Sequence, residues 1–444
     1  MLKTFKLGGI HPPEEKRSKD QAIEVLPIPK VAYIPFSQHL GAPAKVIVNR
    51  GDLVKTGQLI AKQEGFISAN IHSSVSGKVK KIDNVIDASG YRRPVVVIDV
   101  EGDEWVDGII RTDEIKKEVM LSQKEIIDKI NENGVVGLGG ATFPSYVKLM
   151  VPDGKKAEVL IINGVECEPY LTSDHRLMLE KGEEILVGTK ILMMALGVKR
   201  AMIGIENNKP DAIEHLTKLA ANFKGIEVHA LKVKYPQGAE KQLIKALTGR
   251  EVPSAKLPIE VGAVVNNAGT AFAVYEAVQK NKPLFERVVT LTGKSVKKPS
   301  NFKVRIGTPI SDLIEAAGGL PDDTGKIIGG GPMMGKSLSS VDVPVVKGTS
   351  GILIMPDAEA GRKEVQNCIR CSRCVTVCPM GLEPYLIEKT VIVEDFERTE
   401  NERVMDCIEC GSCQYTCPAN RPLLDYLRLG KNKVGFIMRT RSKR

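Results

Sequence analysis

The sequence has few aromatic residues and no long apolar run, and both absences narrow the classes of protein that it can encode. Phe, Trp and Tyr make up 5% of the 444 residues, with a single Trp. No uncharged apolar stretch reaches the roughly 18 residues that a membrane-spanning helix needs. The N-terminal residues lack the apolar core of a signal peptide. We therefore expect a cytoplasmic protein that reaches a membrane only through partners or its own surface.

Cysteine is nearly absent outside one region near the C-terminus. Of nine cysteines, all but Cys167 lie between Cys368 and Cys417. This distribution argues against a secreted disulfide framework and for a reducing compartment. Catalytic triads and metal-hydrolase motifs are also missing. The length of 444 residues predicts several domains, and 42% hydrophobic residues is ordinary for globular proteins.

The pattern C-x-x-C-x-x-C-x-x-x-C-P occurs twice in the cysteine-rich region. Its cysteines are Cys368, Cys371, Cys374 and Cys378 in the first copy, and Cys407, Cys410, Cys413 and Cys417 in the second. Three closely spaced cysteines can hold three corners of a cubane cluster while the fourth reaches to the other cluster. The pattern therefore predicts two [4Fe-4S] clusters, one on Cys368, Cys371, Cys374 and Cys417 and one on Cys407, Cys410, Cys413 and Cys378.

Zinc and disulfides are the structural alternatives for these cysteines. Zinc also uses C-x-x-C pairs, but it needs only four ligands, so the additional cysteines and the prolines Pro379 and Pro418 would be superfluous. Disulfides would have to close within unworkably short loops. Because two clusters pass single electrons, the pattern predicts an electron-transfer protein.

Basic residues gather at the C-terminal end, although the net charge of +9 is modest for the length. No acidic residue follows Gly430, and the basic residues there are Lys431, Lys433, Arg439, Arg441, Lys443 and Arg444. This composition is typical of a solvated, partly disordered tail, or of a segment that docks on an acidic partner or an anionic membrane. Nucleic-acid binding is not expected, because no recognition motif accompanies the charge.

The first 115 residues are expected to form a small β domain. Short apolar runs alternate with turns from residue 25 to about 100, and the segment Gly51 to Ala61 resembles the barrel of biotinyl and lipoyl carrier domains. The hairpin that would carry the modified lysine contains none, so the domain is predicted to be structural or a docking face. His39 and His72 are interpreted as hydrogen-bonded structural groups.

From about residue 124 the pattern changes to alternating helices and strands. Residues 157–163 read as a buried strand, Asp174 to Leu196 as one long amphipathic helix, and two further strands flank a helix at about residue 210. This alternation predicts a doubly wound parallel α/β domain, in which ligands bind at the carboxyl ends of the strands.

Four loops of this domain carry the candidate binding residues. The first, residues 137–144, is glycine-rich and precedes a short helix with Lys148, a combination that suits a phosphate. The second (163–169) and fourth (265–270) follow strands, and the third (235–240) precedes a helix. Each loop alone fits tight turns and helix caps. The presence of four beside a cluster domain favours a cofactor site, while Cys167 is most simply a buried thiol.

Together these loops resemble those of the flavin-binding subunit of respiratory NADH dehydrogenase. Across nearly the whole chain, the sequence is more similar to the RnfC (RsxC) family of the Rnf electron transport complex. That resemblance is carried by Phe5 to Pro13, Ile34 to Ala44, the segment G-F-I-S-A-N-I-H-S-S-V-S-G-K-V and the doubled cysteine motif.

The resemblance implies FMN in the α/β domain with NAD(H) stacked on it. It assigns the flavin phosphate and ribityl to Gly137, Gly139, Gly140, Lys148, Asn266, Asn267 and Thr270. Asn163, Glu166, Tyr235 and Gly238 would line the rest of the flavin site, Phe143 would pack on the nucleotide, and Glu168 and Glu240 would lie beside the nicotinamide. Leu138, Val165 and Ala239 depart from the NADH dehydrogenase pattern at an Arg, an Asp and a Glu.

The expected fold is therefore a multidomain α/β protein with five segments. These are a barrel-sandwich-like β domain (1–115), a Rossmann-like FMN- and NAD-binding domain (116–285), a β-grasp-like SLBB domain (286–352), an α-helical ferredoxin domain with two [4Fe-4S] clusters (353–430) and a basic tail (431–444). The glycine-rich segment Gly329 to Gly335 would ordinarily be a flexible turn.

A nicotinamide exchanges two electrons and a cluster exchanges one, and a flavin can do both. The resemblance thus implies a peripheral subunit of a membrane ferredoxin:NAD+ oxidoreductase, on the cytoplasmic face. It would work with membrane subunits that transport ions and with a ferredoxin-type carrier subunit. Two alternatives remain open at this point. One is a soluble NADH-dependent reductase similar to cobalamin reductases, and the other is a non-enzymatic iron-sulfur scaffold or sensor.

Overall fold

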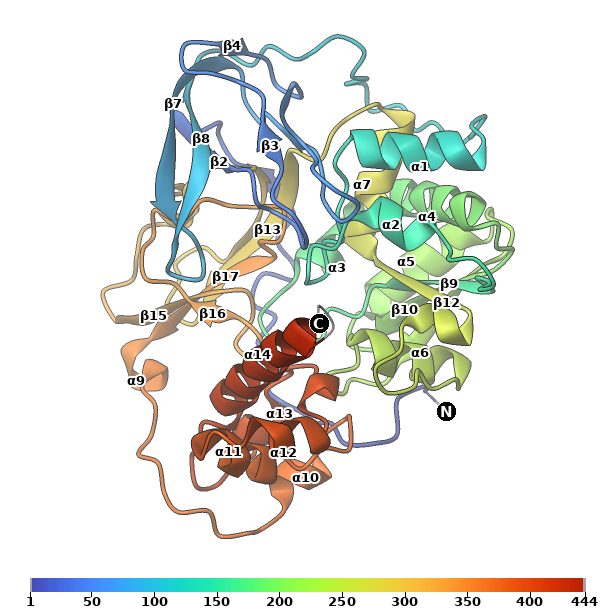
Figure 1. The fold of residues 1–444 in the computed structure, drawn as a ribbon. Coiled ribbons are helices and arrows are strands. Elements are labelled where there is room, and N and C mark those ends of the chain that lie inside the picture. Colours follow the sequence, from blue (N-terminus) through green and yellow to red (C-terminus); the bar gives the residue numbers. More distant parts are fainter. Residues whose placement is uncertain (1, 442–444) are drawn as a thin grey trace.

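The structure is a computed structural model that describes residues 2–441. It contains an N-terminal β part, an α/β part, a second β-rich part and a helical C-terminal part (Figure 1). In the view of Figure 1 the helical part, orange to red, lies at the bottom, and the α/β part occupies the right side.

The N-terminal part consists of two small antiparallel sheets, of order β2-β8-β7-β4 and β3-β5-β6. Its strands are β2 Val31–Pro35, β3 Lys45–Val46, β4 Leu53–Val54, β5 Leu59–Lys62, β6 Ile71–His72, β7 Gly77–Ile86 and β8 Arg92–Val100. Alternating side chains such as Ile34, Ile60 and Ile98 are fully buried and form its core. The predicted all-β stretch is thus confirmed.

The hairpin that carries no lysine contacts the α/β part of the same chain. The Tyr146 hydroxyl donates to the carbonyl of Phe66. His39 Nε2 lies 3.0 Å from the carbonyl oxygen of Ala69. Burial, with Lys347 adding to it, lowers the pKa of His39 to about 4 and that of His72 to about 3. Both imidazoles are therefore neutral at pH 7, in agreement with a structural role.

The α/β part is built on a four-stranded parallel sheet of order β11-β10-β9-β12. Its strands are β9 Val159–Asn163, β10 Ala201–Glu206, β11 Ile226–Leu231 and β12 Ala263–Asn267. Its helices are α1 Gln123–Glu132, α2 Ser145–Leu149, α3 Ser173–Glu180, α4 Gly182–Leu196, α5 Pro210–Ala220, α6 Glu240–Thr248, η1 Pro258–Val261 and α7 Ala268–Gln279. The chain order reverses between β9 and β12, so their carboxyl ends, Asn163 and Asn267, mark the switch point where such sheets bind ligands.

The single long helix predicted from Asp174 to Leu196 is wrong in one respect. Lys181 leaves the helical conformation, with φ −131° and ψ 31°, and divides the segment into α3 and α4. Gly182 then begins α4, where a Cβ would lie 2.9 Å from Nε2 of His215 on α5. The apolar periodicity continues through the break, which is why the sequence pattern did not reveal it.

The second β-rich part is a six-stranded mixed sheet of order β1-β14-β13-β17-β15-β16. Its strands are β1 Ile23–Val25, β13 Glu286–Gly293, β14 Ser300–Arg305, β15 Thr324–Gly329, β16 Lys336–Ser337 and β17 Gly351–Pro356. The helices α8 Ile310–Ala316 and α9 Asp357–Ala360 accompany it. The edge strand β1 comes from the N-terminal segment, so residues predicted to belong to the first domain complete this sheet.

The C-terminal part is helical, as predicted. It contains α10 Arg373–Thr376, α11 Pro384–Ile392, α12 Phe396–Asn401, η2 Val404–Asp406, α13 Ser412–Tyr415 and α14 Leu423–Arg441. The prediction of a separate, partly disordered basic tail is wrong for residues 431–441, which continue α14, and Lys443 and Arg444 lie outside the described residues. Val434 is fully buried within α14 and joins the apolar core around the cysteines. Among residues 2–441, no helix has the length and apolar character needed to cross a membrane.

Candidate functional site

The glycine-rich loop closes over the switch point of the parallel sheet. The amide of Leu138 donates to Thr270 Oγ1 at 2.9 Å, which ties the loop to the first turn of α7. A Cβ on Gly139 would lie 2.9 Å from Cβ of Asn267, so only glycine allows this approach. Gly140, by contrast, is exposed and has no atom within 4 Å of a built Cβ. The turn of the loop therefore faces open space beside the strand ends.

The two adjacent asparagines at the end of β12 have different roles. Asn267 caps α7, since its Oδ1 accepts the amide of Thr270 at 3.2 Å, and its Nδ2 donates to Asp174 Oδ2 at 2.6 Å. The Nδ2 of Asn266 is buried and has no partner in the described structure, although the residue is only 4% exposed. A buried donor without an acceptor is costly, and a ligand oxygen at this place would satisfy it.

Lys148 and Glu240 meet at the side of the same loop. Lys148 Nζ lies 3.0 Å from Glu240 Oε1 and donates to the carbonyl of Val265 at 3.0 Å. Both side chains are partly exposed, so the pair can exchange partners with a ligand at little cost. The predicted phosphate-binding lysine therefore lies at the strand ends, next to a carboxylate predicted for the nicotinamide end.

Asn163, Gly238 and Glu166 lie at the end of β9. Asn163 Nδ2 donates to the carbonyl of Gly238 at 2.8 Å, so these two predicted residues are brought together. The carboxylate of Glu166 accepts the amides of Asp174 at 2.8 Å and His175 at 3.1 Å. It thereby satisfies free amides at the start of α3, where a negative charge is favourable. Glu166 thus holds α3 in place from a loop in which its own φ is +47°.

Cys167 is a free thiol that is partly buried, whereas the sequence predicted a buried thiol. Its Sγ accepts the amide of Gly238 at 3.3 Å, and a Cβ on Gly238 would lie 3.2 Å from it. Burial raises the pKa of this thiol, and Glu206 adds to the shift. The thiol is therefore protonated and packs as an apolar group between the second and third loops.

Tyr235 and Glu168 face the cluster domain rather than the glycine loop. The Tyr235 hydroxyl donates to the carbonyl of Cys410 at 2.8 Å and lies 3.4 Å from Glu168 Oε1. The Glu168 carboxylate accepts the amides of Met333 at 3.1 Å and Met334 at 2.8 Å. Burial raises its pKa to about 7 against the effect of these hydrogen bonds. Glu168 thus joins three parts of the chain, and the segment expected to be a flexible turn is one of them.

Two residues that organise the site were missed by sequence analysis. Lys16 donates from Nζ to the carbonyls of Glu166, Glu168 and Leu171, at 2.8, 2.8 and 2.7 Å. Asp174 orients the Asn267 amide, and burial is the main cause that raises the pKa of Asp174 to about 7. The residues that Lys16 and Asp174 contact are distant from them in sequence, so no local pattern around Lys16 or Asp174 indicated these contacts.

Seven of the eight motif cysteines lie in two groups in the helical part, and each group takes one member from the other motif. Burial raises the pKa of Cys374, and the neighbouring Cys417 and Cys368 add to the shift. Burial likewise raises the pKa of Cys407 to about 12, with Cys410 and Cys378 contributing. Cys378 also contributes to the raised pKa values of Cys410 and Cys413. Cys378 therefore lies with the second motif and Cys417 with the first, an arrangement that the predicted exchange of fourth ligands requires.

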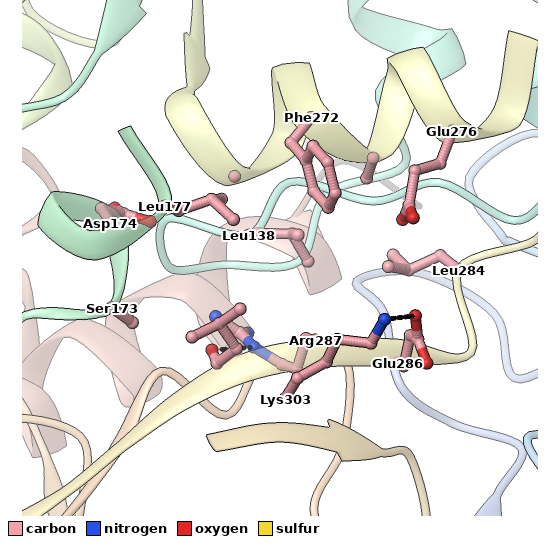
Figure 2. A pocket seen from close by; sticks show the side chains of 13 residues that line it. Leu138, Ser173, Asp174, Leu177, Phe272, Glu276, Leu284, Glu286, Arg287 and Lys303 are labelled. Atoms are coloured by element: carbon pink, nitrogen blue, oxygen red, sulfur yellow. Dashed lines mark hydrogen bonds and ion pairs between the residues drawn. The ribbon is translucent and has the colours of Figure 1, made fainter. Parts of the chain in front are cut away.

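Figure 2 shows a cavity beside the glycine loop, between α7 and β13. Its lining includes Leu138, Asp174 and Arg287, and the Lys303–Glu286 ion pair at 3.0 Å lies at its edge. The cavity measures about 40 Å³, whereas sites that enclose small organic ligands have roughly 300 Å³ or more. A flavin cannot fit there. The candidate site is the open edge at the carboxyl ends of β9 and β12, where the glycine loop, Lys148 and the unpartnered amide of Asn266 lie.

Four known families match consecutive parts of the chain. Their descriptions and the residues matched are the RnfC barrel sandwich hybrid domain (3–103), the Nuo51 FMN-binding domain (130–276), the SLBB domain (288–337) and the 4Fe-4S dicluster domain (360–418). The predicted fold class is thereby confirmed, and the interpretation of the cysteines as a two-cluster domain is favoured over zinc.

Two curated relatives are similar over most of their length. The C subunit of the proton-translocating ferredoxin:NAD(+) oxidoreductase complex of Clostridium ljungdahlii is 48% identical over 87% of this chain and 84% of that protein. The C subunit of the Na(+)-translocating ferredoxin:NAD(+) oxidoreductase complex of Acetobacterium woodii is 44% identical over 97% of each chain. An NAD+-reducing [NiFe]-hydrogenase in the H2-reduced state shares the fold, with a TM-score of 0.50 and 18% identity over 70% of this chain and 62% of that one.

These matches favour the first of the three functions considered from the sequence. The order of the domains, the switch-point loops and the paired cysteine groups agree with that assignment. The chain belongs to the RnfC family of the Rnf-type ion-translocating ferredoxin:NAD(+) oxidoreductase complexes, with an FMN-binding domain and a 4Fe-4S dicluster domain in one polypeptide.

Proposed function

We propose that FMN binds at the carboxyl ends of β9 and β12, with its phosphate and ribityl chain against Gly137, Gly139, Gly140, Lys148 and Asn266. The observation that carries this proposal is the buried, unpartnered Nδ2 of Asn266 at the end of β12, where the next residue, Asn267, lies against Gly139 of the glycine loop. Backbone amides of such a loop and the Lys148 ammonium suit an anionic phosphate. The residues present therefore fit the group that the family description names.

Asn267 and Thr270 support this site without needing to contact the flavin. Their polar side-chain atoms already hold α7, Asp174 and the glycine loop. Asn163, Glu166, Tyr235 and Gly238 would line the flavin ring on the side of β9. Leu138, which stands where an Arg was expected, has its side chain at the cavity of Figure 2. The amide of Leu138, rather than its side chain, holds the glycine loop against α7 through Thr270.

NAD(H) would enter on the side of Phe143 and Glu240. Phe143 is partly exposed at the end of the glycine loop, where an aromatic ring can pack on a nucleotide. Glu240 is partly exposed and becomes available when a phosphate takes its place beside Lys148. Glu168 is already engaged by two amides, so we assign it to the domain junction first and to the nicotinamide end second.

Each cluster would be bound by three cysteines of one motif and the fourth cysteine of the other motif. We assign one cluster to Cys407, Cys410, Cys413 and Cys378, and the other to Cys368, Cys371, Cys374 and Cys417. The first of these lies nearer to the flavin domain, because Tyr235 bonds to Cys410 and Gln242 Nε2 donates to the carbonyl of Pro379 at 3.1 Å. FMN bound at the switch point would exchange electron pairs with a nicotinamide and single electrons with clusters.

We further propose that the chain works on the cytoplasmic face of a membrane, with membrane subunits that transport ions and a ferredoxin-type carrier subunit. The two relatives named above are subunits of ion-translocating ferredoxin:NAD(+) oxidoreductase complexes, which supports this assignment. The chain itself would supply the nicotinamide, flavin and cluster sites and leave ion transport to its partners.

An FMN titration tests the site directly. Purified protein, reconstituted anaerobically with iron and sulfide, should bind about one FMN per chain with quenching of flavin fluorescence and should hold about eight irons. Absence of FMN binding by protein that retains its iron would refute the flavin site while leaving the cluster assignment in place. Binding of zinc in preference to iron would refute the clusters.

A further inference from the structure

The two cysteine motifs form loops of the same shape. In the first motif Ile369, Arg370 and Cys371 follow Cys368, and in the second Ile408, Glu409 and Cys410 follow Cys407. The middle residue is left-handed in both loops, with φ of 55° at Arg370 and 57° at Glu409. The two loops therefore present their isoleucine and second cysteine in similar ways, and their surroundings can be compared position by position.

The loop of the second motif is covered by the rest of the protein. Ile408 packs on an apolar cluster that includes Ile10, Tyr235 and Met333. Cys410 is 8% exposed, and its carbonyl accepts the Tyr235 hydroxyl. A Cβ on Gly411 would lie 2.8 Å from the carbonyl oxygen of Met333. The flavin domain and the turn after β15 thus form a fitted partner for this loop.

The loop of the first motif has no such cover. Ile369 is 69% exposed and Val365 is 49% exposed. Cys371, the equivalent of the buried Cys410, is exposed as well. An isoleucine at the tip of a cluster loop is stabilising when another surface buries it and unfavourable when it stays in water. The loop of the first motif therefore exposes apolar side chains that a second protein could bury.

The charges around the two loops point to the kind of protein. Glu409 is paired with Arg428 at 3.3 Å and Lys431 at 3.0 Å. In the first loop its equivalent is Arg370, and Arg373 and Lys363 are exposed nearby. No ion pair of these three basic residues is found within residues 2–441. An apolar centre with a basic rim fits a partner whose contact surface is acidic.

We propose that residues 363–373, the bare loop, are the docking surface for a small acidic iron-sulfur electron-carrier protein, with Ile369 at the centre and Lys363, Arg370 and Arg373 at the rim. This inference rests on the proposed function, because it assumes a cluster on Cys368, Cys371, Cys374 and Cys417. The loop of the second motif, Cys407 to Cys410, faces the flavin domain, and the bare loop would face the partner. Electrons would therefore enter or leave the chain at the exposed Cys371 side.

The test measures binding of an acidic bacterial two-cluster ferredoxin to the iron-loaded protein by titration calorimetry. The variant Ile369→Asp/Arg370→Glu should bind at least tenfold more weakly than the parent protein. The control Tyr91→Asp/Arg92→Glu changes a similar pair on the N-terminal β part, where Tyr91 is 66% exposed, and should bind like the parent. Parent binding should also weaken as salt rises, because rim charges are screened.

A second measurement uses the unmodified protein and so does not depend on how the variant folds. Hydrogen exchange with and without the ferredoxin should show protection at residues 363–373. Equal affinities of parent and variant, or protection confined to other segments, would overturn the proposal. Transfer of electrons from the reduced clusters to NAD+ needs no carrier protein, so loss of that reaction would refute the proposed function while the binding data still decide the docking surface.

Discussion

Asn266 and Asn267 stand next to each other at the end of β12, yet their side chains have separate tasks. The Asn267 amide is fully occupied by Thr270 and Asp174. The Asn266 Nδ2 is buried without a partner. Asn267 therefore stabilises the helix that follows the strand, whereas Asn266 has a buried donor, which we propose binds the flavin.

Replacing these asparagines should separate binding from stability. Asn266→Ala should raise the dissociation constant of FMN about fivefold to thirtyfold, since one buried hydrogen bond contributes about 1–2 kcal/mol. Asn267→Ala should instead lower stability by about 1 kcal/mol through loss of the cap. Flavin fluorescence and thermal unfolding measure the two effects. An unchanged FMN affinity in Asn266→Ala and an unchanged stability in Asn267→Ala would contradict these two roles.

For single residues, the sequence predicts where the site residues lie better than it predicts what their side chains contact. The four loops and Lys148 could be placed at the strand ends because glycine, asparagine and strand ends are local signals. The use of Glu166 to anchor α3, and of Lys16 to bind three carbonyls, depends on contacts between distant segments. Such contacts become visible only when the chain is folded.

Helix α14 also differs from what its local sequence suggested. Its basic residues suggested a tail, but its buried face packs on α11 and α12. Lys431 also donates to the carbonyl of Cys407 at 2.6 Å, so the helix supports the second cysteine loop directly. Charge on the exposed face therefore concealed an amphipathic helix that completes the cluster domain.

A substitution on the buried face of α14 should release iron. Val434→Asp places a carboxylate at a fully buried position, and burying an unpaired charge costs several kcal/mol. We expect this variant to hold fewer irons per chain than the parent and to unfold at a lower temperature. Phe436→Asp, two residues along on a side chain that is 64% exposed, is the matched control.

Iron analysis and thermal unfolding compare the three proteins. The control should retain the iron content and melting temperature of the parent. If Val434→Asp behaves like the control, α14 is not part of the core that holds the cysteines.

The strands and most helices were predictable because their periodicity is local. The parallel sheet, the start of α6 and the strand-to-helix junction at Asn267 all follow from alternation and capping signals. The break at Lys181 and the contribution of β1 to the second sheet were not predictable. In both cases the deciding contacts lie in other elements, with His215 near Gly182 and β14 beside β1.

At the scale of the whole molecule, three parts meet at one junction. Tyr235 belongs to the flavin domain, Met333 and Met334 to the turn after β15, and Cys410 to the second cysteine motif. Glu168 and the Tyr235 hydroxyl connect them through hydrogen bonds of 2.8 to 3.4 Å. The N-terminal segment adds to the junction, since the amide of Gly9 donates to the carbonyl of Val377 at 2.9 Å. The cluster domain is therefore fixed against the flavin domain.

We propose that the clusters and the proposed nicotinamide site exchange electrons inside this chain, and that bound FMN is needed for this exchange. The most direct test reduces the two clusters with dithionite, removes the excess and adds NAD+ under anaerobic conditions. The two clusters hold two electrons, enough for one NADH, and dithionite also reduces bound FMN, which holds two more. We expect the clusters to reoxidise and one to two NADH to form per chain when FMN is bound, and neither to happen without FMN. Clusters that stay reduced with FMN bound, or that reoxidise equally well without it, would contradict this proposal.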